Sequence, residues 1–201
     1  MSPIAIHCIV LAAGGSKRFG SPKQLVRVNG KSLLQAAIGQ ATDSLGAAVT
    51  VVLGAHASEI VEALLPNSAG VLINRHWQEG IASSIRAGVN SLPGVCNGVM
   101  LALADQPLVG SQIFQRLIAA WRRLPRQIIA SQFASTTGLP AIFPCWCFAD
   151  LSGLRGDQNA QVVIRRYADH VVRLAHPEAQ LDINYPEDLL EIPIAKTGAP
   201  K

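Results

Sequence analysis

The chain has 201 residues, of which 49% are apolar and 15% charged, and its formal net charge is +4. This composition is typical of a globular protein and excludes a disordered or fibrous chain. The length predicts one domain, 1–201. No apolar run approaches the ~20 residues of a membrane span, so we expect no membrane among the partners. The cations form no basic stripe with interleaved aromatics, so we expect no nucleic acid either.

Strands and helices alternate along the first half of the chain. Apolar runs predict strands at 4–11, 47–54, 70–74 and 98–104, and helical spacing predicts helices at 32–41, 56–65, 80–92 and 111–123. Ser32 and Ser111 are the expected N-caps of the first and last of these helices, and Pro66-Asn67 is the expected end of the second.

Shorter elements are predicted in the second half. Strands are expected at 127–131, 140–144 and 171–174, helices at 148–154 and 158–167, and a capped helical turn at the end of 181–190. The residues from about Ala195 are expected to fray.

The four alternations predict right-handed βαβ units, and therefore an α/β fold whose mostly parallel central sheet carries helices on both faces. Ligands of such sheets bind at the carboxyl ends of the strands. The loop after the first strand and Asp105, which follows the strand at 98–104, should therefore face one crevice.

The N-terminal residues lack the charged segment of a signal peptide, which predicts a cytoplasmic protein. The four cysteines, Cys8, Cys96, Cys145 and Cys147, are then expected to be reduced thiols. Cys145 and Cys147 have no second cysteine or histidine pair at ligand spacing, so we expect packing side chains there and no metal site.

A glycine-rich loop follows the first predicted strand, in the stretch Leu11-Ala-Ala-Gly-Gly-Ser-Lys-Arg-Phe-Gly-Ser-Pro-Lys-Gln-Leu25. It is neither G-x-G-x-x-G nor a P-loop. Its free backbone N–H groups, with Lys17, Arg18 and Lys23, suit a bound polyphosphate: arginine can donate two hydrogen bonds to phosphate oxygens, and lysine supplies a compact charge. The alternative is a surface loop with incidental cations.

Acidic residues supply a candidate metal site. Asp105 ends an apolar strand across from the loop, where a carboxylate can hold Mg²⁺ together with substrate phosphates and water; the alternative is a structural Asx-turn. Asp182 and Asn184 share one face of an extended segment, and either could supply a second oxygen ligand. The alternative there is that Asn184 or Tyr185 simply starts a short helix.

The segment 74–84 joins a strand end to a helix start. Backbone N–H groups near Gly80 and the Ser83 hydroxyl could receive a ribose, a base or a phosphate. Histidine and tryptophan are more often packing residues than catalytic ones, so we expect His76 and Trp77 to lie outside the site.

These stretches together resemble the MobA-like nucleotidyltransferase superfamily, whose signature L-A-A-G-x-S-x-R-F/M-G-x-x-K the first one matches. The agreement continues through Asn74…Trp77…Gly80…Ser83-Ser84, Leu103-Ala-Asp-Gln-Pro107, Gly138-Leu-Pro-Ala-Ile-Phe143, Leu154-Arg-Gly-Asp157 and Asp182-Ile-Asn-Tyr-Pro-Glu-Asp188. Within that superfamily the chain looks most like the molybdenum cofactor cytidylyltransferases, in which P-K-Q-L and G-x-P…L-x-G-D recur. The resemblance covers nearly the whole chain and implies a three-layer, Rossmann-like nucleotidyltransferase fold.

The resemblance also implies an activity: Mg²⁺-dependent transfer of CMP from CTP to the terminal phosphate of molybdopterin, with release of pyrophosphate. Mn²⁺ is an alternative ion, and a molybdoenzyme that receives the product is a further expected partner. The implied catalytic residues are Arg18, Lys23 and Asp105, and the implied metal ligands are Asp105 with Asp182 or Asn184. The implied nucleotide-binding residues are Leu11, Ala12, Ala13, Gly14, Gly15, Ser16, Arg18, Lys23, Asn74, Gly80, Ser83 and Asp105.

Two departures from the family pattern concern the acceptor. The usual G-D-x-G-A-R is here Gly156-Asp-Gln-Asn-Ala-Gln161, and Tyr185 stands where threonine is usual before Pro-Glu-Asp. Three alternatives therefore stay open: a guanylyltransferase or sugar-phosphate nucleotidyltransferase, a non-catalytic molybdenum cofactor chaperone, and an NAD-dependent oxidoreductase. Ala12-Ala13-Gly14 and Pro22-Lys23 differ from the guanylyl pattern, and an NAD enzyme would carry G-x-G-x-x-G.

Overall fold

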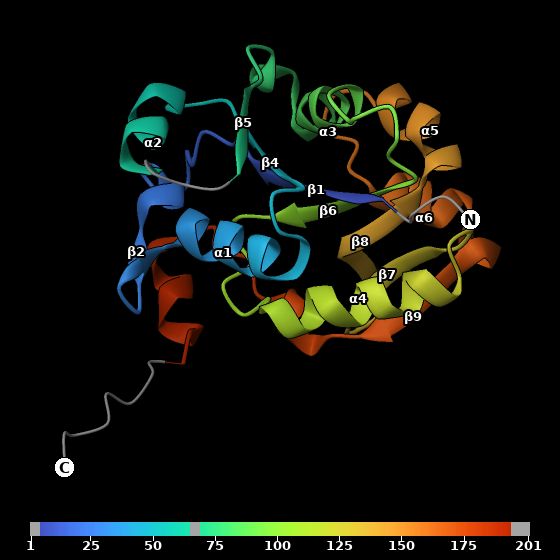
Figure 1. The fold of residues 1–201 in the computed structure, drawn as a ribbon. Coiled ribbons are helices and arrows are strands. Elements are labelled where there is room, and N and C mark those ends of the chain that lie inside the picture. The colour runs from blue at the N-terminus through green and yellow to red at the C-terminus, as the bar shows by residue number, and fades with distance from the viewer. Residues whose placement is uncertain (1–4, 65–68, 194–201) are drawn as a thin grey trace.

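The computed structural model describes residues 5–64 and 69–193. In these residues seven strands form one sheet in the order β5-β4-β1-β6-β8-β7-β9. Neighbouring strands run parallel except at β8, which is antiparallel to both β6 and β7. The predicted α/β fold with a mostly parallel sheet is confirmed (Figure 1).

The elements follow the predicted order. The strands of the sheet are β1 (Ile6–Ala12), β4 (Val49–Leu53), β5 (Gly70–Ile73), β6 (Gly98–Leu103), β7 (Ile128–Phe133), β8 (Thr136–Pro144) and β9 (Val171–Ala175). The α-helices are α1 (Leu33–Leu45), α2 (Ala57–Leu64), α3 (Ile81–Asn90), α4 (Ser111–Arg123), α5 (Phe148–Gly153) and α6 (Gln161–Arg166).

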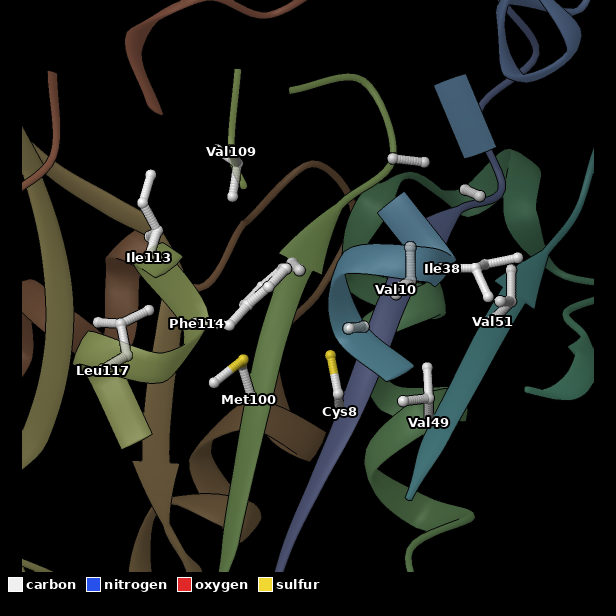
Figure 2. Packing of buried hydrophobic residues seen from close by; sticks show 14 of the residues in the cluster. Cys8, Val10, Ile38, Val49, Val51, Met100, Val109, Ile113, Phe114 and Leu117 are labelled. Carbon is white, nitrogen blue, oxygen red and sulfur yellow. The ribbon is translucent and has the colours of Figure 1, made fainter. Parts of the chain in front are cut away.

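Alternate residues of the central strand β1 face opposite layers. Cys8 and Val10 join the cluster under α1, α2 and α4, whereas Ile9 and Leu11 join the one under α3, α5 and α6. All four side chains are buried because helices cover both faces, which explains the nearly uninterrupted apolar run. Figure 1 shows α1 and α4 on one side of the sheet and α3 and α5 on the other, and Figure 2 shows the first cluster.

A third, smaller cluster joins segments that are far apart in the sequence. Leu33, Ile183 and Ile192 are buried together, with Phe19, Val26 and Leu189 packed against them. This cluster attaches the C-terminal segment to the loop that follows β1.

Several local predictions needed correction. Ser32 caps α1 in a capping box with Gln35, as predicted, but Ser111 is the first residue of α4 and Gly110 is its N-cap, so no side chain caps that helix. Residues 27–32 form a small hairpin, β2 (Arg27–Val28) with β3 (Lys31–Ser32), because Asn29 and Gly30 adopt the positive φ of a tight turn. β8 begins four residues before 140, since it pairs with β7 in a second hairpin.

Residues 158–160 precede α6 rather than belonging to it. The predicted stop at Pro66-Asn67 and the frayed end from Ala195 lie outside the described residues.

The four cysteines are free thiols. Burial raises the pKa of Cys8 and that of Cys147 to about 12. In residues 5–64 and 69–193 no group of three or more His, Cys, Asp or Glu side chains is arranged to hold a metal ion. Among the same residues no helix is long and apolar enough to cross a bilayer.

Candidate active site

A pocket of about 480 Å³ lies at the carboxyl ends of β1 and β6. The predicted site residues that line it are Leu11, Ala12, Ala13, Gly14, Gly15, Lys23, Gly80 and Asp105. Lys17, Gln24, Leu33, Trp77, Gln78, Ile81, Ser84, Leu103 and Ala104 complete the lining. The expected crevice between the glycine-rich loop and Asp105 is therefore present.

Lys23 connects the loop to the acidic side of the site. It begins the 3-10 turn η1 (Lys23–Leu25), and its Nζ lies 2.5 Å from Asp105 Oδ2 and 2.7 Å from the carbonyl oxygen of Ile183. The Ile183 N–H in turn donates to the Asp105 carbonyl at 2.9 Å. These contacts join three segments: the end of the glycine-rich loop at Lys23, the residue that follows β6, and the C-terminal segment at Ile183. Ile183 is also buried in the third cluster.

Asp105 and Asp182 each keep one buried carboxylate oxygen, Oδ1, that has no hydrogen-bond partner among the described residues. Burial raises the pKa of Asp182 to about 6, and the negative charge of Asp105 contributes in the same direction, while Gln106 and Lys23 lower it. Two half-buried carboxylates that interact electrostatically, each with one buried and unused oxygen, are an arrangement that a divalent cation stabilises. The residues present therefore fit such an ion.

The raised pKa of Asp182 predicts that the stability of the metal-free protein, kept so by a chelator, depends on pH. Between pH 4 and 6 the native state binds more protons than the unfolded state, so the free energy of unfolding should fall as the pH rises through this window. Asp182→Asn, which cannot titrate, should lack this component. Thermal unfolding of both proteins from pH 4 to 8 measures it: we expect the variant to gain stability relative to wild type as the pH rises, and a constant difference would contradict the assignment.

Asn184 is placed differently from Asp182. Its Oδ1 accepts a hydrogen bond of 2.8 Å from Nη2 of Arg18, whose guanidinium also lies 5.1 Å from the centre of the Tyr185 ring. The N–H groups of Asn184 and Tyr185 donate to Asp188 Oδ2 at 2.7 and 2.8 Å, and they hold the pKa of Asp188 below its usual value. The Asn184 oxygen is therefore already bonded.

Arg18 lies outside the pocket lining in the described part of the chain. Its guanidinium is directed to Asn184 and Tyr185, so in this conformation it fastens the glycine-rich loop to the C-terminal segment. Phosphate binding by Arg18 stays a prediction.

Asn74 and Ser83 are both buried behind the pocket wall. Asn74 Nδ2 donates to the hydroxyl oxygens of Ser83 and Ser84 at 2.8 and 3.0 Å, and its Oδ1 accepts from the His76 N–H. Ser83 Oγ donates to the Gly80 carbonyl. The two side chains connect the end of β5 to the first turn of α3, and of the serines it is Ser84 that lines the pocket. Their contact with a nucleotide stays a prediction.

The rim of the pocket at Gly80 touches the segment that departs from the family pattern. Gly80 has φ +106°, and a Cβ there would come within 2.4 Å of the Gly156 carbonyl oxygen. That carbonyl also accepts the Ala82 N–H at 3.1 Å. The segment beginning at Gly156 therefore borders the pocket at the start of α3.

Trp77 was wrongly excluded from the site, because it lines the pocket. A Cβ added to Gly15 would lie 3.2 Å from the Trp77 ring, and a Cβ added to Gly54 would lie only 2.5 Å from the Cβ of Trp77. The ring thus occupies space that two glycines leave open. This pairing of distant glycines with a tryptophan could not be read from the sequence.

Residues 8–171 match the model of the MobA-like NTP transferase domain. The chain belongs to this family of nucleotidyltransferases. It is 28% identical over 167 residues to the nicotine blue oxidoreductase of Paenarthrobacter nicotinovorans, covering 79% of this chain and 80% of that one. It is 25% identical over 167 residues to the purine catabolism protein PucB of Bacillus subtilis (strain 168), covering 78% and 79%.

The fold is similar to that of Rv0371c from Mycobacterium tuberculosis H37Rv, with a TM-score of 0.81, 26% identity, and coverage of 94% of this chain and 98% of the other. A structure of Rv0371c in complex with manganese matches with a TM-score of 0.76 at 25% identity, covering 94% and 99%. The family and the fold implied by the sequence motifs are thus confirmed.

Proposed function

We propose that this nucleotidyltransferase moves CMP from CTP to the terminal phosphate of molybdopterin and releases pyrophosphate. The observation that carries the proposal is the pair of unpartnered carboxylate oxygens on Asp105 and Asp182, beside a pocket lined by a glycine-rich loop and by Lys17 and Lys23. Positive charge and backbone donors on one side, with a carboxylate pair on the other, suit a metal-bound triphosphate. The choice of CTP and of molybdopterin rests on the resemblance of the sequence motifs.

Asp105 and Asp182 are the residues that would hold Mg²⁺, with Mn²⁺ as the alternative ion. We favour Asp182 over Asn184, since the Asn184 oxygen already accepts from Arg18. The manganese complex of Rv0371c supports the use of a divalent ion. Such an ion would neutralise charge on the phosphates and thereby lower the barrier to attack on phosphorus.

The protein itself needs to align two substrates. The acceptor phosphate oxygen attacks the α-phosphorus of CTP, a new P–O bond forms, and the bond between the α-phosphorus and the bridging oxygen breaks as pyrophosphate leaves. Because the acceptor oxygen is already anionic, no general base is required. Backbone N–H groups of the loop and the ammonium groups of Lys17 and Lys23 stabilise the charge on the β- and γ-phosphates.

The Gly156–Gln161 segment is our candidate for acceptor recognition. It borders the pocket at Gly80, and it is the stretch whose sequence departs from the cytidylyltransferase pattern. A phosphorylated acceptor other than molybdopterin is compatible with that departure.

A second candidate comes from the relative named nicotine blue oxidoreductase. The same pocket could receive the pyrophosphate of a nicotinamide dinucleotide, with the reduction of an aromatic acceptor as the outcome. The absence of G-x-G-x-x-G from the sequence makes this the weaker candidate.

Pyrophosphate release tests the proposal. We expect release with CTP, dependent on molybdopterin and on Mg²⁺ or Mn²⁺, and little with GTP, ATP or UTP. Release with GTP in place of CTP would overturn the nucleotide assignment alone, whereas no release with any nucleotide would overturn the transferase proposal. Oxidation of NADH or NADPH in the presence of nicotine blue, measured in parallel, would support the second candidate.

A further inference from the structure

Gln24 lies beneath the glycine-rich loop, with 2% of its surface exposed. Its Nε2 donates to the carbonyl oxygens of Ala12 and Gly14 at 2.9 and 2.8 Å. Its Oε1 accepts from Ser16 Oγ at 3.2 Å, and Ser16 Oγ accepts from the Lys23 N–H at 3.1 Å. One side-chain amide therefore holds three points of the loop and, through Ser16, the start of the turn that carries Lys23.

These bonds set the direction of the loop's peptide groups. In a planar trans peptide the N–H points opposite to the C=O, so the N–H groups of Ala13 and Gly15 point away from Gln24. The intervening Ala13 carbonyl accepts from the Ala55 N–H at 3.1 Å, which fixes the third peptide. Within the described residues, the N–H groups of Gly14, Gly15 and Ser16 donate to no protein acceptor.

We propose that Gln24 is a positioning residue for the triphosphate, acting through the loop backbone. The inference rests on the proposed function, since it takes a nucleoside triphosphate as the ligand. By bonding the carbonyls of Ala12 and Gly14, Gln24 keeps their oxygens from facing the phosphates and leaves N–H groups of the loop free to bind them.

No other side chain provides this combination at the same size. Glutamine supplies two N–H donors and a carbonyl acceptor on one terminal group, and here both donors have carbonyl partners. Glutamate would lack the donors and would face the Ala12 and Gly14 oxygens with like charge. Leucine would leave two carbonyls without a donor, and they would be free to rotate toward the anion.

The test compares Gln24→Leu and Gln24→Glu with wild type. Binding of CTP and of inorganic tripolyphosphate is measured by calorimetry, and KM and kcat are measured for CTP and for molybdopterin. We expect the Kd of both anions and the KM of CTP to rise at least tenfold in Gln24→Leu and further in Gln24→Glu, with less than a twofold change in the KM of molybdopterin. A merely structural role would change all of these together with the thermal midpoint.

Gln40→Leu is the matched control. Gln40 Oε1 accepts the Ser111 N–H at 2.6 Å between α1 and α4, so this variant also loses a glutamine bond to the backbone, but away from the pocket. It should bind both anions as wild type does. Should Gln24→Leu fail to fold, Ser16→Ala, which breaks the link from Gln24 to Lys23, takes its place with the same expected direction.

The outcomes separate the two proposals. Unchanged tripolyphosphate affinity in folded Gln24 variants would overturn the inference about Gln24 and leave the proposed function standing. Wild type that binds CTP and tripolyphosphate without releasing pyrophosphate would overturn the proposed function, while the effect of Gln24 on binding would still be measured. Wild type that binds neither anion would overturn both.

Discussion

Asp105→Asn should lower pyrophosphate release about 10³-fold while leaving the protein folded. The carboxylate follows β6 at the pocket, receives the Lys23 ammonium on Oδ2 and keeps Oδ1 buried and unpartnered. Asparagine has the same shape and can still accept from Lys23, but it removes the negative charge on which the proposed binding of a divalent cation depends. Steady-state release of pyrophosphate, with far-UV circular dichroism as the check on folding, measures the effect.

Asp150→Asn is the matched control. Asp150 also pairs with a cation, Arg166, and accepts from the Tyr167 hydroxyl at 2.9 Å, but it lies outside the pocket lining in the described residues. The same chemical change there should leave turnover within twofold of wild type. Binding of Mn²⁺, followed by electron paramagnetic resonance, should weaken in Asp105→Asn and not in the control. A fully active Asp105→Asn protein would rule out the metal-binding role.

Gly80→Ala should cost about 3 kcal/mol of the free energy of unfolding. At φ +106° any side chain is strained, and the added methyl carbon would lie 2.4 Å from the Gly156 carbonyl oxygen, which is backbone and cannot rotate away. The segment at Gly156 must then shift, and with it the pocket rim. We therefore expect a raised KM for the substrates along with the loss of stability, measured by urea unfolding and initial rates.

Gly39→Ala gives the contrast. Gly39 lies inside α1, and a Cβ there would meet nothing within 4 Å. Alanine has the higher helix propensity, so this variant should gain about 0.5–1 kcal/mol. If both variants were equally stable, the strain assigned to Gly80 would be wrong.

The relation between Lys23 and Asp105 bears on how the site is filled. Lys23 Nζ contacts Asp105 Oδ2 and the Ile183 carbonyl, so the ammonium lies among the oxygens beside which we place a metal ion. The Lys23 ammonium offsets the negative charge of Asp105 and Asp182. On our proposal, a bound triphosphate would offer Lys23 a new anionic partner and leave Asp105 to the metal ion.

The sequence by itself determined the fold class, the position of the glycine-rich loop and the placement of Asp105. Each depends on local features: β1 and β6 are nearly uninterrupted apolar runs because helices cover both faces, and loops at the carboxyl ends of neighbouring parallel strands must meet. The first motif carried the family assignment, which the match over residues 8–171 confirmed.

Tertiary structure alone decided the partners of these residues. In the folded chain Asp182 Oδ1 has no partner among the described residues. Asn184 Oδ1, by contrast, accepts a hydrogen bond from Arg18, which lies 166 positions away in the sequence. The role that we propose for Gln24 likewise depends on the tertiary structure, which buries its side chain beneath the glycine-rich loop and bonds it to two loop carbonyls. The physical reason is the same in each case: hydrogen bonds and burial depend on which segments the folded sheet brings together, and residue type and spacing do not encode those distances.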